Sequence, residues 1–423
     1  MPTGWSDGVF YRAYNWVADK AASIKIVASR MDGEFDNYKT GLENCITRDN
    51  QTPPTAAISW NSQKITSLAN GTASTDAVNL GQVTGLTTGN AFRRNLLING
   101  GFDVWQAGAG GSASIAGTAA RVRTADCWWA VRATAATGYT VSQQTGTVNR
   151  YALKWQRDNA NASTAVMYLA QSLETANVVR LKRGTPPTCY LSFYAKSGAN
   201  YSGGNLTVDV VRGTGSDENV LDTYTGATTL ATLAQAITST LTRYSVAVPI
   251  DTSTNELGVR FSWTPSGVAG ADDSVTLENV QLEVASAATD FEYLPFDDTL
   301  RRCMRYYEKS FHYNVAPAQN TDWTQRNARA LFFRMNAGTA SQVSPPILFM
   351  APKRVGLTLA PTFYNPQAAN AFVRNITAGT DAASTTLDSG LQEWGFMVNF
   401  NFAGAGSVGD MLGVHWVAGD PNF

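Results

Sequence analysis

The sequence has 423 residues, which is enough for two or three compact units. Charged residues make up only 15% of the sequence, below the roughly 25% typical of soluble domains. With 32 basic and 33 acidic residues the formal net charge is -1, so charge gives no reason to expect nucleic acid or anionic lipid as a partner.

The sequence gives little support for metal, redox or membrane chemistry. Its cysteines, at positions 45, 127, 189 and 303, lie far apart, without the paired spacing of zinc sites or thiol-exchange motifs. The N-terminal run MPTGWSDGVFYRAYNW lacks a basic segment followed by an apolar one, and no stretch approaches 18 apolar residues. We expect no metal, no cofactor and no membrane insertion, and a chain that folds in the cytosol where it is made.

The run SRMDGEFDNYKTGLENC predicts a helix over residues 29–45, with Ser29 as its N-terminal cap. Its apolar residues follow the spacing of a coiled-coil seam. These seam residues are Met31, Phe35, Tyr38, Leu42 and Cys45. We predict that identical copies of the chain meet along them. A single amphipathic helix that packs on its own domain is the alternative, because two heptads are short evidence.

Residues 61–93 are rich in Gly, Thr and Asn and have too few apolar side chains to close a core, so they predict a linker or a shared neck. The run ITSLANGTASTDAVNLGQV resembles a motif of trimeric phage fibres, and its TDAVN core resembles the necks of trimeric bacterial adhesins. Residues 1–60 resemble the N-terminal region by which phage tail fibres attach to the virion. The resemblance implies a homotrimer that docks on other tail, baseplate or collar proteins.

Residues 94–296 show the alternation of β-strands. Residues 189–195, 244–250 and 257–263 each place apolar side chains on one face. The apolar row through residues 275–284 changes phase after Leu277 and continues at Val280, Leu282 and Val284, which predicts a β-bulge. Many short rows with Gly-rich turns predict an antiparallel, jelly-roll-like β-sandwich.

The same block carries the most specific resemblance in the chain. It opens with RNLLINGGFDVWQAG and closes with VTLENVQLEVASAATDFEYLPFDDTLRRCMRYYEKS. This order resembles a carbohydrate-binding-module-like sandwich of phage tail fibres, bracketed by an Asn-Gly-x-Phe start and a Gln-Leu-Glu…Thr-x-Phe-Glu end. Two departures from the commonest form are Val284-Ala285, where a Gly often follows the Glu, and the Gly/Ala-rich loop at residues 107–118.

The remaining residues predict a connector helix and a second β-domain. Residues 297–311 place Leu300, Met304, Tyr307 and Phe311 on one helical face, and the arginines beside them favour a solvated or subunit-bridging face over a nucleic-acid site. Residues 312–423 alternate again and resemble C-terminal domains of phage fibres. One predicted row there consists of Trp394, Phe396, Val398, Phe400 and Phe402.

Enzymatic motifs are weak. The run GAGSVG at residues 404–409 fits the dinucleotide fingerprint, but a strand pattern follows it in place of the helix that the fingerprint needs, so we predict a hairpin loop. The histidines His312 and His415 accompany no Gly-x-Ser-x-Gly motif. Glycan cleavage would need two carboxylates. The candidates are Asp126, Glu278, Glu283 and Glu292.

Binding without catalysis is the function that the sequence favours, since the repeat period typical of β-helical depolymerases is absent. Sugar rings stack on aromatic side chains, and neutral polar groups satisfy their hydroxyls. The glycan-binding candidates are Trp105, Trp128, Trp129, Tyr151 and Trp155. Trp128 and Trp129 are adjacent, so a strand would point them to opposite faces. For each candidate, a place in the core is the alternative.

We therefore expect a mainly β protein with five regions: an attachment region with a short helix (1–60), a neck (61–93), a sandwich (94–296), a connector helix (297–311) and a C-terminal β-domain (312–423). The resemblance implies a structural tail fibre of the virion, assembled in the host cytoplasm, that recognises a host glycan or outer-membrane receptor. A collar or whisker fibre without receptor binding, or a glycan-cleaving tailspike, is the alternative.

Overall fold

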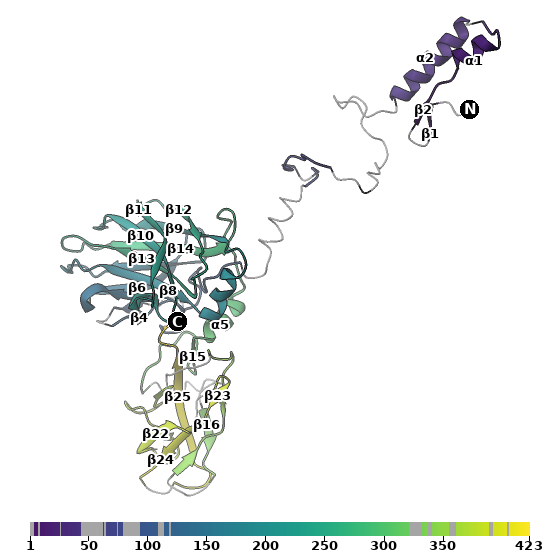
Figure 1. The fold of residues 1–423 in the computed structure, drawn as a ribbon. Helices are drawn as coiled ribbons and strands as arrows, with labels where there is room; N and C mark the ends of the chain where they lie inside the picture. The colour runs from purple at the N-terminus through teal and green to yellow at the C-terminus, as the bar shows by residue number, and fades with distance from the viewer. Residues whose placement is uncertain are drawn as a thin grey trace. The chain divides into compact units, whose positions relative to one another are not determined.

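The protein is mainly β, with several antiparallel sheets and few helices (Figure 1). The computed structural model describes residues 4–6, 9–25, 27–43, 62, 65–73, 75–78, 94–108, 114–117, 120–320, 331–336, 341–354, 361–388, 392–403 and 406–423. The chain divides into two compact units, Met1–Gln82 and Val83–Phe423. The second unit contains the sandwich and the C-terminal β-sheets.

The first unit contains a β-hairpin and two helices. Its elements are β1 (Gly4–Ser6), β2 (Val9–Tyr11), α1 (Trp16–Ala21) and α2 (Ala28–Glu43). The Asn15 side chain caps α1 by accepting hydrogen bonds from the backbone N–H groups of Val17 and Ala18, each 3.2 Å long. Helix α2 confirms the predicted helix, but the Ser29 cap is wrong, because Ser29 lies inside a helix that begins at Ala28.

The seam residues of α2 are exposed in the single chain. The side chains of Phe35 and Leu42 are 61% and 69% exposed, and Met31 is also exposed. Tyr38 stacks on Phe10 of β2 with ring centroids 5.7 Å apart, so its own chain covers part of it. Cys45 lies outside the described residues. Of the predicted neck, residues 62, 65–73 and 75–78 are described, and these contain neither helix nor strand.

Two six-stranded antiparallel sheets form the predicted sandwich. The first has the order β11 (Thr228–Ala236), β10 (Asn205–Gly213), β13 (Glu256–Trp263), β8 (Met167–Leu173), β5 (Trp129–Arg132) and β4 (Val122–Arg123). The second has the order β12 (Thr242–Pro249), β9 (Thr188–Ser197), β14 (Asp273–Val284), β7 (Tyr151–Arg157), β6 (Tyr139–Thr145) and β3 (Ser114–Ala116). Between strands lie η1 (Ala133–Ala135), α4 (Thr175–Val178), η2 (Val179–Lys182) and η3 (Val220–Asp222).

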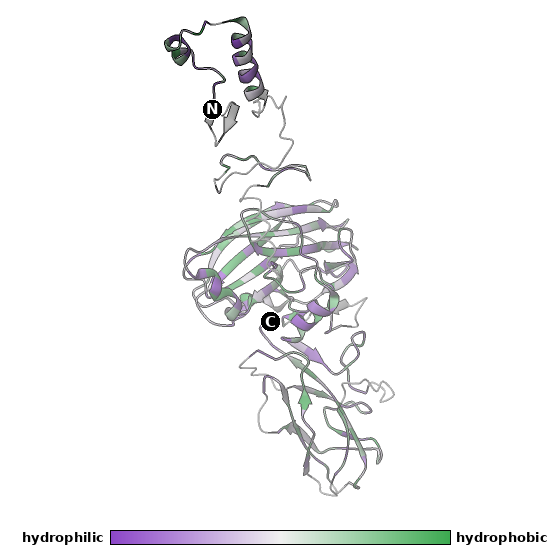
Figure 2. Ribbon diagram, turned by 90° about the vertical axis from the view of Figure 1, so that its right-hand side faces the viewer, coloured by the Kyte–Doolittle hydropathy of each residue, from purple (hydrophilic) through white to green (hydrophobic). Residues whose placement is uncertain are grey.

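The core of the sandwich lies between the two sheets. The Trp155 and Trp263 rings meet edge-on with centroids 6.0 Å apart, and Phe193 meets Phe261 in the same way at 5.0 Å, so both contacts join one sheet to the other. Hydrophobic and hydrophilic residues alternate along the sandwich strands (Figure 2). The apolar rows predicted for residues 189–195 and 257–263 are buried, which confirms these strand faces.

The predicted bulge is present in β14. The pairing of β14 with β9 shifts register between Glu278 and Gln281. Asn279, inside the shift, has a backbone φ of 52°, a conformation that Asn tolerates better than most residues. The shift returns Val280 to the core, where it is fully buried. Val284 is 42% exposed and does not continue the buried row as predicted, because the strand ends there.

The connector is shorter than predicted. Helix α5 spans Phe296–Met304, and the chain then forms β15 (Tyr307–Lys309), which pairs with β25 (Met411–Gly419). The predicted helix to residue 311 is therefore wrong beyond Met304. Pairing with a distant strand overrides the helical spacing of Tyr307 and Phe311.

The C-terminal β-domain surrounds β25. Its largest sheet contains β15 and β25. The other strands of this sheet are β16 (Leu331–Arg334), β19 (Thr362–Tyr364), β20 (Arg374–Asn375) and β21 (Thr380–Asp381). Two smaller sheets contain β17 (Ser341–Val343), β24 (Val398–Asn401) and β22 (Ser384–Leu387), and β18 (Ile347–Leu348) and β23 (Gly395–Phe396). Phe396, Val398, Phe400 and Phe402 are buried as predicted, whereas Trp394 is 63% exposed.

Residues 404–409, of which 404 and 405 lie outside the described residues, fall between strands of two different sheets. Strand β24 before it pairs with β17 and β22, whereas β25 after it pairs with β15, β16, β19 and β20. The predicted hairpin is therefore wrong, since the flanking strands belong to different sheets. The strand that follows the segment is the expected one, and it leaves no helix N-terminus to bind a pyrophosphate.

Candidate functional site

A hydrogen-bonded clasp joins the start of the sandwich to its end. The Asn95 Oδ1 accepts from the Leu282 N–H at 3.0 Å, and its Nδ2 donates to the Val280 carbonyl at 3.0 Å. The Glu292 carboxylate accepts from the N–H groups of Arg94 and Asn95, at 3.0 and 2.9 Å. A Cβ at Gly100 would lie 2.0 Å from the Val280 oxygen, so only glycine fits there.

The Gln-Leu-Glu motif closes the same clasp from within. The Gln281 Nε2 donates to Glu283 at 2.9 Å, and the Gln281 Oε1 accepts from the Glu292 N–H at 2.8 Å. Glu283 in turn accepts from the Thr289 N–H and hydroxyl, at 2.8 and 2.7 Å. In these motifs Asn95, Gln281, Glu283 and Glu292 therefore have a structural role, because their hydrogen bonds shape the end of the sandwich.

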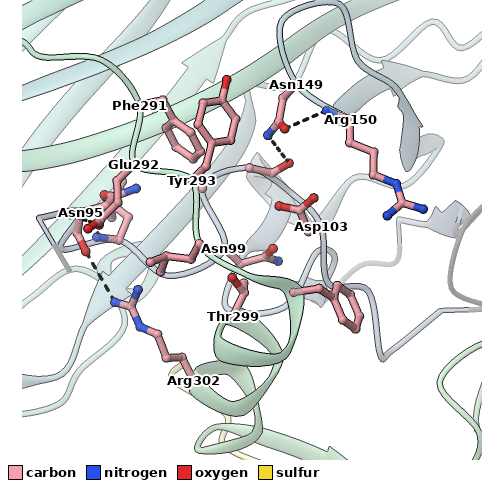
Figure 3. Close-up of a pocket in the computed structure, with 15 residues that line it drawn as sticks. Asn95, Asn99, Asp103, Asn149, Arg150, Phe291, Glu292, Tyr293, Thr299 and Arg302 are labelled. Carbon is pink, nitrogen blue, oxygen red and sulfur yellow. Dashed lines mark hydrogen bonds between the residues drawn. The ribbon is translucent and has the colours of Figure 1, made fainter. Parts of the chain in front are cut away.

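A cavity of about 220 Å³ opens beside the clasp (Figure 3). Its wall combines aromatic rings, amides and charged groups from the start of the sandwich, the β6–β7 loop and the segment that leads into α5. The side chains that matter below are those of Asn99, Asp103, Asn149, Arg150, Phe291, Tyr293 and Phe296. This volume lies below the roughly 300–1,000 Å³ of typical ligand pockets, so the cavity suits one small polar ring better than a long chain.

Asp103 gives the cavity its electrostatic character. Its carboxylate lies among the lining side chains (Figure 3). Burial raises the pKa of this carboxyl to about 6, although the charge of Arg150 opposes the shift. The Arg150 guanidinium lies 4.9 Å from the Tyr151 ring centroid and is exposed. The Asp103 carboxylate is thus a partly desolvated hydrogen-bond acceptor that faces the cavity.

Two exposed rings border the cavity. Tyr293 is 61% exposed, yet its hydroxyl donates to the Val148 carbonyl at 3.0 Å and accepts from the Asn279 Nδ2 at 3.1 Å. Phe296 is 44% exposed and meets the Tyr313 ring edge-on at 5.4 Å. These rings can pack on the apolar face of a ligand, and neighbouring amides can bond its hydroxyls.

A second cavity, of about 360 Å³, lies near α4 and α5. Its walls include Arg180, Glu174 and Arg305. The Arg305 guanidinium binds the Glu174 carboxylate through two hydrogen bonds of 2.8 and 2.5 Å, and the Tyr306 hydroxyl adds a third at 2.7 Å. Since Glu174 and Arg305 pair with each other, we take the first cavity as the candidate site.

Most of the predicted glycan-binding aromatics lie in the core. Trp105, Trp128 and Trp155 are fully buried, so they cannot stack on a sugar, and these assignments are wrong. Trp129 points away from the core, as the alternation predicted, but Arg121 and Arg123 lie over its ring at 5.6 and 4.5 Å and leave it only 9% exposed. Tyr151 is partly exposed, beside the cavity residue Arg150.

The predicted catalytic acids anchor the backbone. Glu278 accepts hydrogen bonds from the Thr147, Val148 and Asn149 N–H groups, between 2.8 and 3.2 Å. Asp126 is fully buried and accepts two bonds from Gln106, at 2.7 and 2.5 Å, while burial raises the pKa of its carboxyl. The two remaining candidates, Glu283 and Glu292, belong to the clasp described above. Of the four, Glu292 lines the cavity beside the clasp, and Asp126, Glu278 and Glu283 do not.

The sequence singled out Glu292 of the cavity wall as a candidate acid, but it did not single out Asp103, Asn149 or Tyr293. A signal for three cavity residues exists in the run FEYLPF, residues 291–296, which contains Phe291, Tyr293 and Phe296 and follows the last strand of the sandwich within a few residues. Within the described residues, no three His, Cys, Asp or Glu side chains cluster so that they could hold a metal ion. None of the helices in the described ranges is long and apolar enough to cross a membrane.

Comparison with known proteins gives matches to solved structures at low sequence identity. No protein-family model and no curated protein sequence matches the chain. The enzymatically active domain of tailspike protein 4 from bacteriophage CBA120 is 11% identical over 45% of this chain and 21% of that chain, with a TM-score of 0.28. A family 4 carbohydrate-binding module is 13% identical over 44% of this chain and 97% of that one, with a TM-score of 0.28.

A xylan-binding domain from Paenibacillus barcinonensis, of carbohydrate-binding family 22, is 17% identical over 43% of this chain and 99% of its own, with a TM-score of 0.27. The chain thus spans 21% of the length of the tailspike and nearly all of the two binding modules. At TM-scores of this size the matches carry no information about ligands.

Proposed function

We propose that this chain is a fibre protein of a phage virion that binds a glycan of the host surface without cleaving it. The observation that carries this proposal is the cavity beside the clasp, where the exposed rings of Tyr293 and Phe296 lie with amides and a partly buried carboxylate, Asp103. Such a mixture suits a polyhydroxylated ring. The resemblance of the sequence to phage fibres supplies the biological setting.

The hydrogen bonds and the burial of the acidic side chains support binding without cleavage. Glycoside hydrolysis needs two carboxyl groups on either side of the scissile bond. Glu278, Glu283 and Glu292 use their oxygens to hold backbone N–H groups, and Asp126 is fully buried. The cavity then offers Asp103 for contact with a ligand, while the N–H groups of Arg94 and Asn95 hold Glu292, the second acid on its wall.

The first unit fits a role in attachment and assembly. Phe35 and Leu42 expose apolar surface along α2, and such a narrow row is buried most fully against identical helices. We therefore propose a homotrimer whose N-terminal region docks on tail, baseplate or collar proteins. Light scattering of the full-length chain at micromolar concentration should give a trimer, and a monomer would contradict the assembly.

Binding to purified host surface polysaccharide tests the glycan proposal. Tyr293→Ala should weaken binding at least about tenfold, a change of about 1.4 kcal/mol. Val268→Ala, which removes an exposed apolar side chain outside the cavity wall, should have no effect. Moderate salt should change the affinity little, since few charges are neutralised.

Three results would favour other functions. Degradation of the polysaccharide by the purified chain would identify a glycan-cleaving tailspike. Virions that lose integrity rather than adsorption when residues 312–423 are deleted would indicate a collar or whisker fibre. Adsorption that collapses in moderate salt would indicate recognition of charge.

A further inference from the structure

Asp103 differs from the other acids near the end of the sandwich. Glu278 and Glu292 accept hydrogen bonds from backbone N–H groups, whereas burial and the charge of Arg150 act on the Asp103 carboxylate, with no hydrogen-bond donor to it among the described residues. A partly buried carboxylate without a donor destabilises a fold. A group retained at such a cost is characteristic of a ligand site.

The aromatic ring at the mouth of the cavity is held in place. The Tyr293 hydroxyl makes two hydrogen bonds, and its ring meets Phe291 edge-on with centroids 5.1 Å apart. The ring is therefore fixed at its far end while its body remains mostly exposed. An aromatic surface that is ordered before binding loses little entropy when a ligand packs on it.

We propose that the cavity recognises a neutral or amino sugar residue through two neighbouring hydroxyls, which donate to the two oxygens of Asp103 while a C–H face of the ring packs on Tyr293. This inference rests on the proposed function and names the ligand class of that site. Hydroxyl bonds to an ionised carboxylate are short and strong. The same charge repels uronic and sialic acids, so Asp103 would determine specificity.

The recognition should depend on pH. The other ionisable groups on the cavity wall are Arg150, Glu292, Arg302 and the Tyr293 phenol. Arginine keeps its charge throughout the useful range, and backbone N–H groups hold the Glu292 carboxylate. Burial raises the pKa of Asp103 to about 6, so protonation of Asp103 below that pH should remove an acceptor and weaken binding.

Ligand-observed NMR titration of the full-length chain tests this inference with named probes. These are methyl α-D-mannopyranoside, methyl β-D-galactopyranoside, D-glucosamine and D-glucuronic acid. At least one of the first three should bind, and glucuronic acid should bind at least about tenfold more weakly than the best of them. Asp103→Asn should weaken the best probe at least about tenfold at pH 7.5. The affinity of the wild type should fall between pH 7.5 and pH 5, whereas that of the variant should stay constant.

Asp290→Asn is the matched control, because the Asp290 side chain is fully exposed and the charge change is the same. Asp103→Asn removes the cost of a buried charge, so its melting temperature should equal or exceed that of the wild type. The inference fails if Asp103→Asn binds as the wild type does, if glucuronic acid binds equally well, or if no probe binds. If the chain still binds host polysaccharide in those cases, the proposed function stands, and if it binds none, the proposed function fails as well.

Discussion

Glu278 offers a direct test of whether the acids of the sandwich are structural. Glu278→Gln keeps one acceptor oxygen and places an NH₂ group against the N–H groups of Thr147, Val148 and Asn149. Loss of a hydrogen bond to a charged group costs about 1.5–3 kcal/mol, and a buried unsatisfied donor costs about 1–3 kcal/mol. We expect the free energy of unfolding to fall by about 3 kcal/mol.

Urea unfolding and hydrogen exchange of the full-length chain measure the two parts of this effect. The amides of residues 147–149 should exchange faster in Glu278→Gln, because their acceptor is weakened. Asp290→Asn, at an exposed side chain, should change stability by less than about 0.5 kcal/mol. The reasoning is refuted if Glu278→Gln matches this control and exchange at residues 147–149 is unchanged. Loss of polysaccharide cleavage in that case would instead assign Glu278 to catalysis.

The other predictions concern the two β-domains. Trp128→Ala should lower the free energy of unfolding by about 3–5 kcal/mol, because the indole is fully buried. Trp394→Ala, at a side chain that is 63% exposed, should change it by less than about 0.5 kcal/mol. Equal losses in urea titrations would contradict the burial of Trp128 and the exposure of Trp394. Arg157 and Asp273 form a fully buried ion pair 2.7 Å long. Arg157→Met should lower the free energy of unfolding by about 3–5 kcal/mol, because the buried Asp273 charge loses its partner. The double variant Arg157→Met/Asp273→Asn should recover part of this loss in urea titrations. Burial lowers the pKa of His415 from 6.5 to about 4, so the unfolded chain binds the extra proton between these pH values. The stability that His415 contributes as a neutral group should be complete above pH 6.5 and should be lost, by about 3 kcal/mol, as the pH falls to 4. The free energy of unfolding of His415→Gln, plotted against pH, should lack this decrease. An identical decrease in the variant and the wild type would exclude His415 as its source.

Much of the sandwich is predictable because strand faces follow from local chemistry. Alternation with a period of two places Leu191 and Phe193 on the same face of their strand, whichever strands pair with it. The burial of apolar side chains then decides that this face is the inner one. The phase change after Leu277 predicted a bulge for the same reason. Period alone does not decide what covers a side chain, and Trp129 shows this, because two arginines cover its outward-facing ring.

Where distant segments pair, local patterns gave the wrong answer. Tyr307 and Phe311 fit a helical face, but the strand at Tyr307 pairs with Gly419, more than a hundred residues later. Trp105, Trp128 and Trp155 have the composition of a sugar platform, yet the packing of two sheets encloses them. Intrinsic preference is weaker than such tertiary contacts.

The β class, the inward rows of the sandwich and the bulge follow from the amino-acid order alone, because each depends on neighbours within one strand. The site depends on how the sheets pack and cannot be read from that order. Asp103, Asn149 and Tyr293 come from three segments spread over nearly two hundred residues, and the clasp together with the Glu278 carboxylate brings these segments to one cavity. A residue type shows what chemistry a side chain can perform, but its burial and its partners, which come from the packing of the sheets, decide whether it meets a ligand.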